Sequence, residues 1–237
     1  MTHDTYADMG EFHDLFMIAR WKQLSPALGE VFGHLTASDR LLDLGAGTGL
    51  GTRELAAVTA ARITAIEPSL LQRAQLTARI IDDAELTQRV SVLSDPLPSA
   101  LHQLPGPVDG FVAAHVLGHL DPGERRRSFA SLRQVLTPGG FGLITMPQAA
   151  AASDDVASTH REELAMGELT YVARYSVLDG DEYLNEYQVW RGDRILRSVA
   201  SRGRWRYLSE RELRAELGSV GFAVDVRADG LGVVRIA

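Results

Sequence analysis

Short apolar runs alternate with segments of helical periodicity over the first 147 residues of the chain. Each apolar run has the length of a buried strand and is followed by glycine, proline, serine or acidic residues, which favour turns. The predicted strands are residues 40–44, 62–66, 90–93, 110–114 and 141–146. The predicted helices are residues 11–23, 26–34, 50–58, 70–81 and 124–136. This alternation predicts an α/β fold with a doubly wound, Rossmann-like and mostly parallel sheet, which binds ligands at the carboxyl ends of its strands.

The pattern changes after Pro147. Residues 148–166 are rich in alanine and acidic residues, which favours a mobile linker or a helical lid. Three runs of β-forming residues follow, at 169–177, 182–190 and 194–207, with turn sequences between them. A helix over 210–217, a strand over 222–227 and a closing hairpin that returns over 233–236 complete the predicted elements. We therefore expect a C-terminal antiparallel hairpin insertion that caps the cleft of the core sheet.

The composition narrows the class of protein. The chain has 237 residues, of which 45% are hydrophobic and 23% charged, values typical of a soluble globular protein. It contains no cysteine, which excludes disulfides, thiolate zinc sites and cysteine nucleophiles. No apolar run approaches the roughly 20 residues of a membrane helix, and the first residues lack the apolar core of a signal peptide. The net charge of −7 disfavours a nucleic-acid partner. We expect a cytoplasmic monomer or homodimer that binds neither nucleic acid nor a membrane.

A glycine-rich loop joins the first predicted strand to the helix after it, with the sequence Asp43-Leu44-Gly45-Ala46-Gly47-Thr48-Gly49. Glycine lets a ligand approach the backbone closely because it has no Cβ. A dinucleotide loop would follow the spacing G-x-G-x-x-G, but its third position falls on Leu50 or Thr52 here. The loop also lacks the Gly-Lys-Ser/Thr sequence of a phosphate loop. By itself, it is equally compatible with a tight strand-to-helix turn.

The Asp-x-Gly-x-Gly-x-Gly sequence resembles the first motif of the class I S-adenosylmethionine-dependent methyltransferase family, of the small-molecule type. Glu67 follows the second predicted strand, 22 positions after Gly45 (67 − 45), close to the offset of about 20 expected for a carboxylate that binds ribose hydroxyls. Asp95 follows the third strand, where the family has an acid that accepts from the adenine amino group. Residues 136–140, Leu-Thr-Pro-Gly-Gly, resemble the Leu-x-Pro-Gly-Gly turn of these enzymes. The resemblance covers residues 6–147 and the hairpin after Phe222.

The resemblance implies S-adenosylmethionine as cofactor and a three-part chain. Residues 1–147 would form a helical N-terminal segment and the cofactor-binding α/β core. Residues 148–207 would form the linker or lid and the hairpin insertion, and residues 208–237 the helix and strands that complete the core sheet. The resemblance also implies a set of cofactor contacts, namely Tyr6, Arg20, Asp43, Gly45, Ala46, Gly47, Gly49, Glu67, Pro68, Asp95, Pro96 and His115.

Two histidines, His115 and His119, follow the fourth predicted strand. In the family this junction lies beside the transferring methyl group. An imidazole with a pKa near 6.5 can remove a proton at neutral pH, so either histidine is a candidate general base. Alternatively, one lines the cofactor cleft and the other packs at a helix start. Their spacing of four could also suit a metal ion, but no third ligand lies nearby in the sequence, and we expect no metal site.

Tyrosine and tryptophan are concentrated after Pro147, where five of the six tyrosines and two of the three tryptophans lie. Because side chains alternate along a strand, Tyr171 and Tyr175 share one face, and so do Tyr183 and Tyr187. Such a surface could hold an organic acceptor, pack as a core, or form a dimer interface. The candidate acceptor contacts are Tyr171, Tyr175, Tyr187 and Trp205.

Three arginines on one predicted strand face add a second possibility. Arg202, Arg204 and Arg206 could bind an anionic group of the acceptor, although pairing with Glu182 and Glu186 on the neighbouring strand is the simpler account.

Together these features predict a methyltransferase (EC 2.1.1) that moves a methyl group to a nitrogen or oxygen of a small molecule, such as a natural product or an amino-sugar-like acceptor. An amine needs only to be neutral when bound, whereas a hydroxyl needs a base. The alternatives are a peptide or protein amine N-methyltransferase, a noncatalytic S-adenosylmethionine-binding domain, and a nucleotide-dependent oxidoreductase. The missing third glycine of the dinucleotide pattern disfavours the last.

Overall fold

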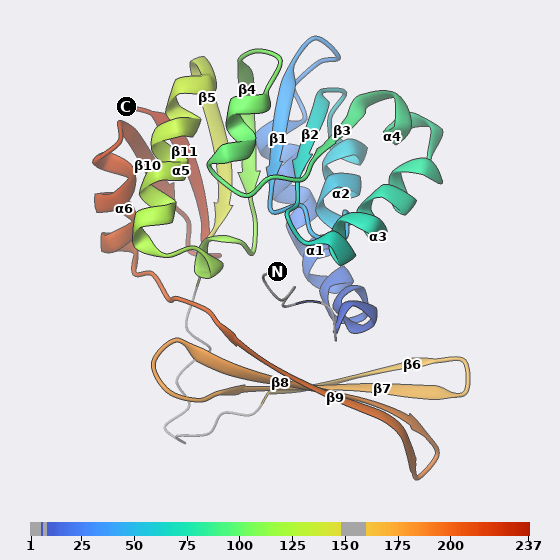
Figure 1. Cartoon of the computed structure of the whole chain (residues 1–237). Coiled ribbons are helices and arrows are strands. Elements are labelled where there is room, and N and C mark those ends of the chain that lie inside the picture. The colour runs from blue at the N-terminus through green and yellow to red at the C-terminus, as the bar shows by residue number, and fades with distance from the viewer. Residues whose placement is uncertain (1–5, 7–8, 148–159) are drawn as a thin grey trace.

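The computed structural model describes residue 6 and residues 9–147 and 160–237, and it contains two sheets (Figure 1). The larger has seven strands in the order β10-β11-β5-β4-β1-β2-β3. Its members are β1 (Arg40–Leu44), β2 (Arg62–Ile66), β3 (Val90–Leu93), β4 (Val108–Ala113), β5 (Leu136–Thr145), β10 (Phe222–Val226) and β11 (Leu231–Ile236). Strands β1 to β5 pair in parallel, whereas β11 is antiparallel to both β5 and β10. The predicted Rossmann-like, mostly parallel sheet is confirmed.

Helices cover both faces of this sheet. They are α1 (Gly10–Phe32), α2 (Leu50–Val58), α3 (Leu70–Ile81), α4 (Ala84–Arg89), α5 (Pro122–Val135) and α6 (Glu210–Gly218), with short 3-10 turns η1 (Ser99–Gln103) and η2 (Leu117–His119). Leu41 and Leu42 are neighbours in β1, yet they belong to different buried clusters because successive side chains point to opposite faces. Leu41 packs with α1 to α4, and Leu42 packs with η1, α5 and α6.

The N-terminal helix is continuous, so the predicted break between helices at 11–23 and 26–34 is wrong. Pro26 lies inside α1, where it removes a backbone donor. A buried stripe of Trp21, Leu24, Leu28 and Val31 nevertheless runs past it and packs on the sheet. Most helical stability in proteins comes from packing of one apolar face, and here that packing outweighs the local effect of the proline.

A second sheet lies below the carboxyl ends of the parallel strands (Figure 1). It is an antiparallel meander of β6 (His160–Met166), β7 (Leu169–Val177), β8 (Glu182–Arg191) and β9 (Arg194–Arg204). The predicted strands at 169–177 and 182–190 are confirmed, and the third ends at 204 instead of 207. Residues 160–166 are a strand instead of a linker or lid, because Gly167, with φ +61°, turns β6 back onto β7. Residues 148–159 of that predicted segment lie outside the described residues.

Two further elements differ from prediction. The sequence pattern predicts no helix at 84–89, but the Asp83 side chain accepts hydrogen bonds from the Glu85 and Leu86 N–H groups and begins α4 there. Residues 137–140, predicted as a break, are part of β5. Gly139 has φ +87°, and the register shifts between Val108 and Gly110, which accommodates the irregularity.

Helix α1 joins the second sheet to the core. Phe12 stacks on Tyr187 with ring centroids 4.8 Å apart and meets Tyr171 edge-on. Met9, Phe12 and Phe16 form a third buried cluster with the inner face of β7 and β8. The inner face of the second sheet is therefore partly a packing surface.

Paired glycine substitutions test the packing of the core. A Cβ on Gly142 in β5 would lie 2.3 Å from the Phe111 ring, so we expect Gly142→Ala to lower the unfolding free energy by about 1–3 kcal/mol. Gly218, near the end of α6, has open space around it, so Gly218→Ala should be neutral or stabilise by about 0.5 kcal/mol. Urea unfolding of both variants measures the difference, and equal effects would contradict this packing.

Candidate functional site

The glycine loop between β1 and α2 is held in an open arc. Gly45 and Gly47 have φ values of +72° and +57°, a region that glycine adopts without strain. A Cβ on Gly45 would lie 2.7 Å from Val116, so this position also needs glycine for space. The N–H groups of Gly45 and Ala46 both donate to the carbonyl oxygen of Ile66, at 3.0 and 2.9 Å. The loop thus depends on the neighbouring strand β2 for its shape.

Glu67, directly after β2, is hydrogen-bonded to this loop. It accepts hydrogen bonds from the Gly47 N–H at 2.8 Å and the Ser69 N–H at 2.7 Å. Its side chain is only 5% exposed, yet it lines a cavity. From this position the carboxylate can accept hydrogen bonds from a ligand in the cavity.

Asp43, at the other end of the motif, lies below the loop and does not line the cavity. It is 1% exposed and accepts from the Thr52 hydroxyl at 2.7 Å, which ties β1 to α2. Burial, with a smaller contribution from the charge of Glu67, raises the pKa of Asp43 to about 6. Its position fits support of the loop instead of direct contact with a ligand.

Two adjoining cavities open at the carboxyl edge of the main sheet. The first, about 740 Å³, lies against the glycine loop, Glu67 and Pro68. The second, about 690 Å³, continues under the second sheet, against Tyr175 and Tyr187. Residues that line both are Tyr6, His13, Met17, His115, His119 and Tyr183. The site therefore has a chamber on the loop side, a chamber on the aromatic side, and a shared wall that includes both predicted histidines.

His115 occupies the junction in a strained conformation. Its φ of +57° is rare for a residue other than glycine, and its N–H donates to the Thr145 hydroxyl at 2.8 Å. Among the described residues, its buried Nε2 atom has no hydrogen-bond partner. Burial, reinforced by the charges of Arg20 and His13, lowers the pKa of His115 to about 4.

His119 lies at the end of η2, against Tyr6 and Trp205. Its Nε2 atom is 3.4 Å from the Tyr6 hydroxyl, and its ring meets Trp205 edge-on at 4.8 Å. The His119 ring borders the cavity and is exposed there. Burial by the surrounding protein lowers the pKa of His119 to about 4, and the charge of His13 makes a smaller contribution. Both histidines are therefore neutral at neutral pH, and each can accept a proton or a hydrogen bond.

The other predicted site residues divide between the two cavities and the surrounding structure. Those that line the first are Tyr6, Gly45, Ala46, Gly47, Glu67, Pro68, His115 and His119. Those that line only the second are Arg20, Tyr175, Tyr187 and Trp205. Those that line neither are Asp43, Gly49, Asp95, Pro96 and Tyr171. Arg20 also pairs with Glu162 at 3.0 Å, Asp95 accepts from Gln103, and Tyr171 packs on Phe12.

Arg204, the last residue of β9, and Arg206, just after it, each lie beside an acidic residue. Arg204 lies 3.3 Å from Glu182, and Arg206 lies 3.4 Å from Asp181. Arg202 and Arg204 also line the first cavity. The pairing of Arg204 with Glu182 is the one predicted from the sequence.

Comparison with protein families identifies the core of the chain. Residues 41–140 match the model of a family described as methyltransferase domain. The chain carries a methyltransferase domain. The matched region begins in β1 and ends in β5, so it contains the glycine loop, Glu67, His115 and His119. It contains neither α1 nor the second sheet. A comparison with curated protein sequences finds no match.

Solved structures share the fold of this methyltransferase domain and of the elements around it. DesVI of Streptomyces venezuelae has a TM-score of 0.75 at 16% identity, over 98% of this chain and 99% of DesVI. CalS10 of Micromonospora echinaspora, an amino pentose methyltransferase solved with S-adenosylmethionine, has a TM-score of 0.70 at 16% identity, over 92% and 91%. The glycopeptide N-methyltransferase MtfA, also solved with S-adenosylmethionine, has a TM-score of 0.57 at 22% identity, over 89% and 91%. The fold is that of class I methyltransferases.

Two other kinds of site are absent from the described part of the chain. No helix there is long and apolar enough to cross a membrane. No group of three or more histidine, aspartate or glutamate side chains there could hold a metal ion.

Several residues that line the two cavities are absent from the predicted site residues. They are His13, Met17, Gln72, Tyr183 and Asn185. His13 and Met17 are four apart on α1, a spacing that marks one helix face but does not reveal that the face meets a cavity. Tyr183 shares the alternation of Tyr187, and that alternation could have placed it among the acceptor contacts.

Asp14 connects α1 to the glycine loop of the methyltransferase domain. It accepts from the Thr48 hydroxyl, from Arg79 of α3 at 2.6 Å, and from His13 at 3.2 Å. Burial tends to raise the pKa of Asp14, but the hydrogen bonds from His13, Thr48 and Arg79 together outweigh burial and lower it well below 3.8. This carboxylate thus fixes the helix across the loop.

Replacement of Asp14 by asparagine should lower the unfolding free energy at pH 7 by about 1–3 kcal/mol. A lowered folded-state pKa stabilises the fold above the unfolded value of 3.8 and loses its effect as the pH falls below it. The difference between wild type and Asp14→Asn should therefore shrink below pH 3.8. Urea unfolding across pH measures it, with Asp193→Asn in an exposed turn as the control. A difference that persists unchanged at low pH would contradict the ionised role of Asp14.

Proposed function

We propose that this protein transfers a methyl group from S-adenosylmethionine to a nitrogen atom of a small, hydroxyl-rich acceptor. The observation that carries the proposal is the placement of neutral His115 and His119 in the wall shared by the two cavities. One cavity lies on the glycine loop, and the other lies on a sheet of tyrosines. A group donor and its acceptor would meet at that shared wall.

The first cavity fits the cofactor. Its volume of about 740 Å³ lies in the range of small-molecule sites. The Glu67 carboxylate would hold the ribose hydroxyls, and the backbone of Gly45 and Gly47, free of Cβ atoms, would lie against the methionine part. S-adenosylmethionine supplies a methyl group already activated by its sulfonium sulfur. The residues of the chain therefore need to orient the acceptor and exclude water.

The electrostatics of the histidines favour nitrogen over oxygen as the acceptor atom. A hydroxyl group is a very weak acid, since water itself has a pKa of about 15.7. A histidine with a pKa of about 4 is too weak a base to ionise such a group. A neutral amine is already nucleophilic, and its nitrogen carries the positive charge once the methyl group has moved from the sulfonium, so the step itself needs no base. Neutral His119 can accept a hydrogen bond from that amine and aim its lone pair, and the Tyr6 hydroxyl beside Nε2 helps to orient the ring. His115 is the alternative acceptor of that hydrogen bond.

The second cavity suits an acceptor with several hydroxyl groups. Tyr175, Tyr187 and Asn185 offer donors and acceptors beside apolar ring surfaces. Burial raises the pKa of Tyr187 to about 12, and burial also raises that of Tyr175, so both phenols keep their protons at neutral pH. An amino-sugar-like compound combines such hydroxyls with an amine. The similarity in fold to an amino pentose methyltransferase and a glycopeptide N-methyltransferase supports this class of acceptor.

Calorimetry of Glu67→Ala tests the cofactor. Wild type should bind S-adenosylmethionine and its demethylated product and should not bind NAD. Loss of the hydrogen bonds to a charged carboxylate costs about 1.5–3 kcal/mol, so Glu67→Ala should bind S-adenosylmethionine about 10- to 100-fold more weakly. Glu85→Gln, which alters a surface pair with Arg89, is the control and should bind as wild type does. Binding of NAD alone would overturn the proposal in favour of an oxidoreductase.

Assays of His119→Asn test the reaction. We expect kcat to fall about 100-fold, because the acceptor nitrogen loses the hydrogen bond that holds it in line with the methyl group. His34→Asn provides a matched control, since His34 stacks on Phe141 away from both cavities. Methyl transfer is measured with labelled cofactor against amino sugars, simple alcohols and peptides. Transfer to peptides alone would favour the peptide or protein alternative, and binding without transfer to any acceptor would favour a noncatalytic domain.

A further inference from the structure

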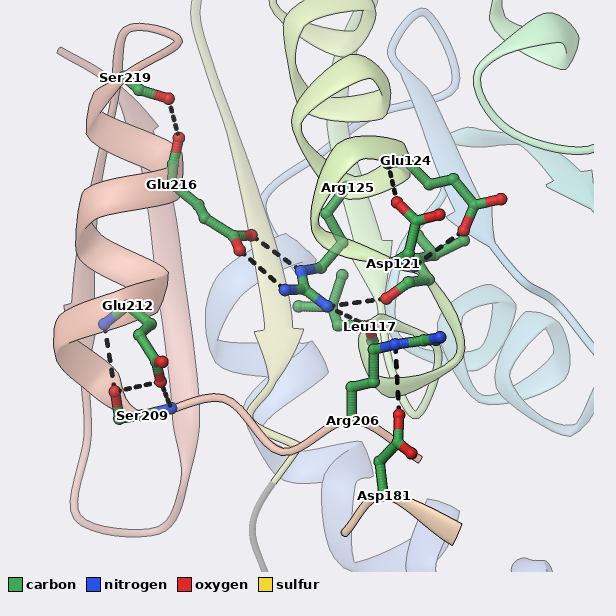
Figure 2. A network of polar contacts seen from close by, with 11 residues as sticks. Leu117, Asp121, Glu124, Arg125, Asp181, Arg206, Ser209, Glu212, Glu216 and Ser219 are labelled. Atoms are coloured by element: carbon green, nitrogen blue, oxygen red, sulfur yellow. Dashed lines mark hydrogen bonds and ion pairs between the residues drawn. The ribbon is translucent and has the colours of Figure 1, made fainter. Parts of the chain in front are cut away.

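The turn that carries His119 is bound through its backbone to a buried arginine (Figure 2). Arg125 lies in the first turns of α5 and is only 2% exposed. Its Nη1 atom donates to the carbonyl oxygen of Leu120 at 2.8 Å and, more weakly, to that of Leu117 at 3.4 Å. These two carbonyls flank His119 in the chain. One side-chain nitrogen therefore bridges the two ends of the η2 turn.

The rest of the Arg125 guanidinium is fixed by Glu216 of α6. Nε and Nη2 donate to the two carboxylate oxygens of Glu216, both at 2.8 Å. Glu216 is 13% exposed, so the pair is largely removed from water. This bidentate arrangement uses Nε and Nη2 and leaves Nη1 to the two carbonyls of the turn. A lysine could not make both sets of contacts, because its ammonium is a single point of donation.

The opposite side of the turn is held by the chain that leaves β9. The Arg206 N–H donates to the carbonyl oxygen of Gly118 at 2.8 Å. The Arg206 side chain lies 3.4 Å from Asp181 (Figure 2). A Cβ on Gly118 would lie 2.4 Å from the Trp205 ring, so the ring rests directly on the backbone of the turn. His119 is thus positioned between Arg125 on the core side and the Trp205 segment on the side of the second sheet.

We propose that Arg125 is a positioning residue for His119, which it acts on through the Leu117 and Leu120 carbonyls. This inference rests on the proposed function of His119. A contribution to stability does not by itself explain the buried Arg125–Glu216 pair, because replacement of a buried ion pair by apolar residues is often neutral or stabilising. What apolar residues cannot supply is a donor to the two carbonyls. A shift of the turn by about 1 Å can cost about 100-fold in rate.

A purely structural role, in which Arg125 only holds α5 against α6, makes a different prediction for two variants. Glu216→Gln removes the charge pair but keeps the Arg125 donors to the turn. Arg125→Lys keeps a positive charge beside Glu216 but loses the bridge between the two carbonyls. A structural role predicts that both variants lose stability and that neither changes kcat per folded molecule.

The test measures kcat, KM and thermal unfolding for both variants, with NMR of histidine-labelled protein. For Arg125→Lys we expect a 10- to 100-fold fall in kcat, an unchanged cofactor KM, and a displaced His119 resonance, with the His34 resonance as an internal reference. For Glu216→Gln we expect a lower Tm with kcat within about threefold of wild type. A wild-type kcat and an unmoved His119 resonance in Arg125→Lys would overturn the proposal, as would an equal loss of kcat in both variants.

A double variant keeps the proposal testable if one of the single variants fails to fold. Arg125→Met with Glu216→Met removes both buried charges together, so it should fold even if a single variant does not. We expect it to be folded and slow, and a wild-type kcat in this variant would overturn the proposal. The NMR measurement needs no catalysis. If His119→Asn keeps full activity while Arg125→Lys still displaces the His119 resonance, the catalytic role of His119 fails and its positioning by Arg125 stands.

Discussion

The hydrogen bonds between the glycine loop and β2 set the geometry on which the site depends. Gly45 and Ala46 donate to Ile66, Gly47 donates to Glu67, and the Glu67 N–H in turn donates to Leu93 of β3 at 3.0 Å. These bonds exist because β1, β2 and β3 are parallel neighbours whose carboxyl ends lie at one edge. The loop is consequently shaped by the order of strands as much as by its glycines.

Helix α1 extends this edge toward the second sheet. It crosses the loop through Asp14, lines both cavities through His13 and Met17, and packs Phe12 on Tyr187. One rigid element therefore contacts the loop side, the shared wall and the aromatic side. This helix therefore sets the spacing between the glycine loop and the tyrosines of the second sheet.

Much of the fold could be predicted because the signals for it are local. Ser69 caps α3 by accepting from the Gln72 N–H, as its place before an apolar period indicates. The strands of the core end where glycine, proline and acidic residues begin. The continuity of α1 past Pro26 could not be predicted in this way, because the burial that sustains it comes from β-strands distant in sequence. The same holds for β6, whose pairing with β7 is tertiary information.

The site was predicted less completely, for a related reason. The motif drew attention to Asp43, but the structure places that residue under the loop, bonded to Thr52, and outside both cavities. The left-handed conformation of His115 and the backbone contacts of Arg125 have no counterpart in residue type or spacing. Such features depend on where distant segments meet.

The two cavities are lined by different parts of the chain, and this affects how each cavity can change through mutation. The loop, Glu67 and both histidines belong to the segment from β1 to β5, whereas the tyrosine wall belongs to the second sheet. Tyr175, Asn185 and Tyr187 of that sheet line the second cavity and not the first, so mutations there can reshape one cavity while the glycine loop of the other keeps its form. A scaffold of this kind can change what one cavity admits through substitutions in a separate sheet, and the parallel core stays as it is.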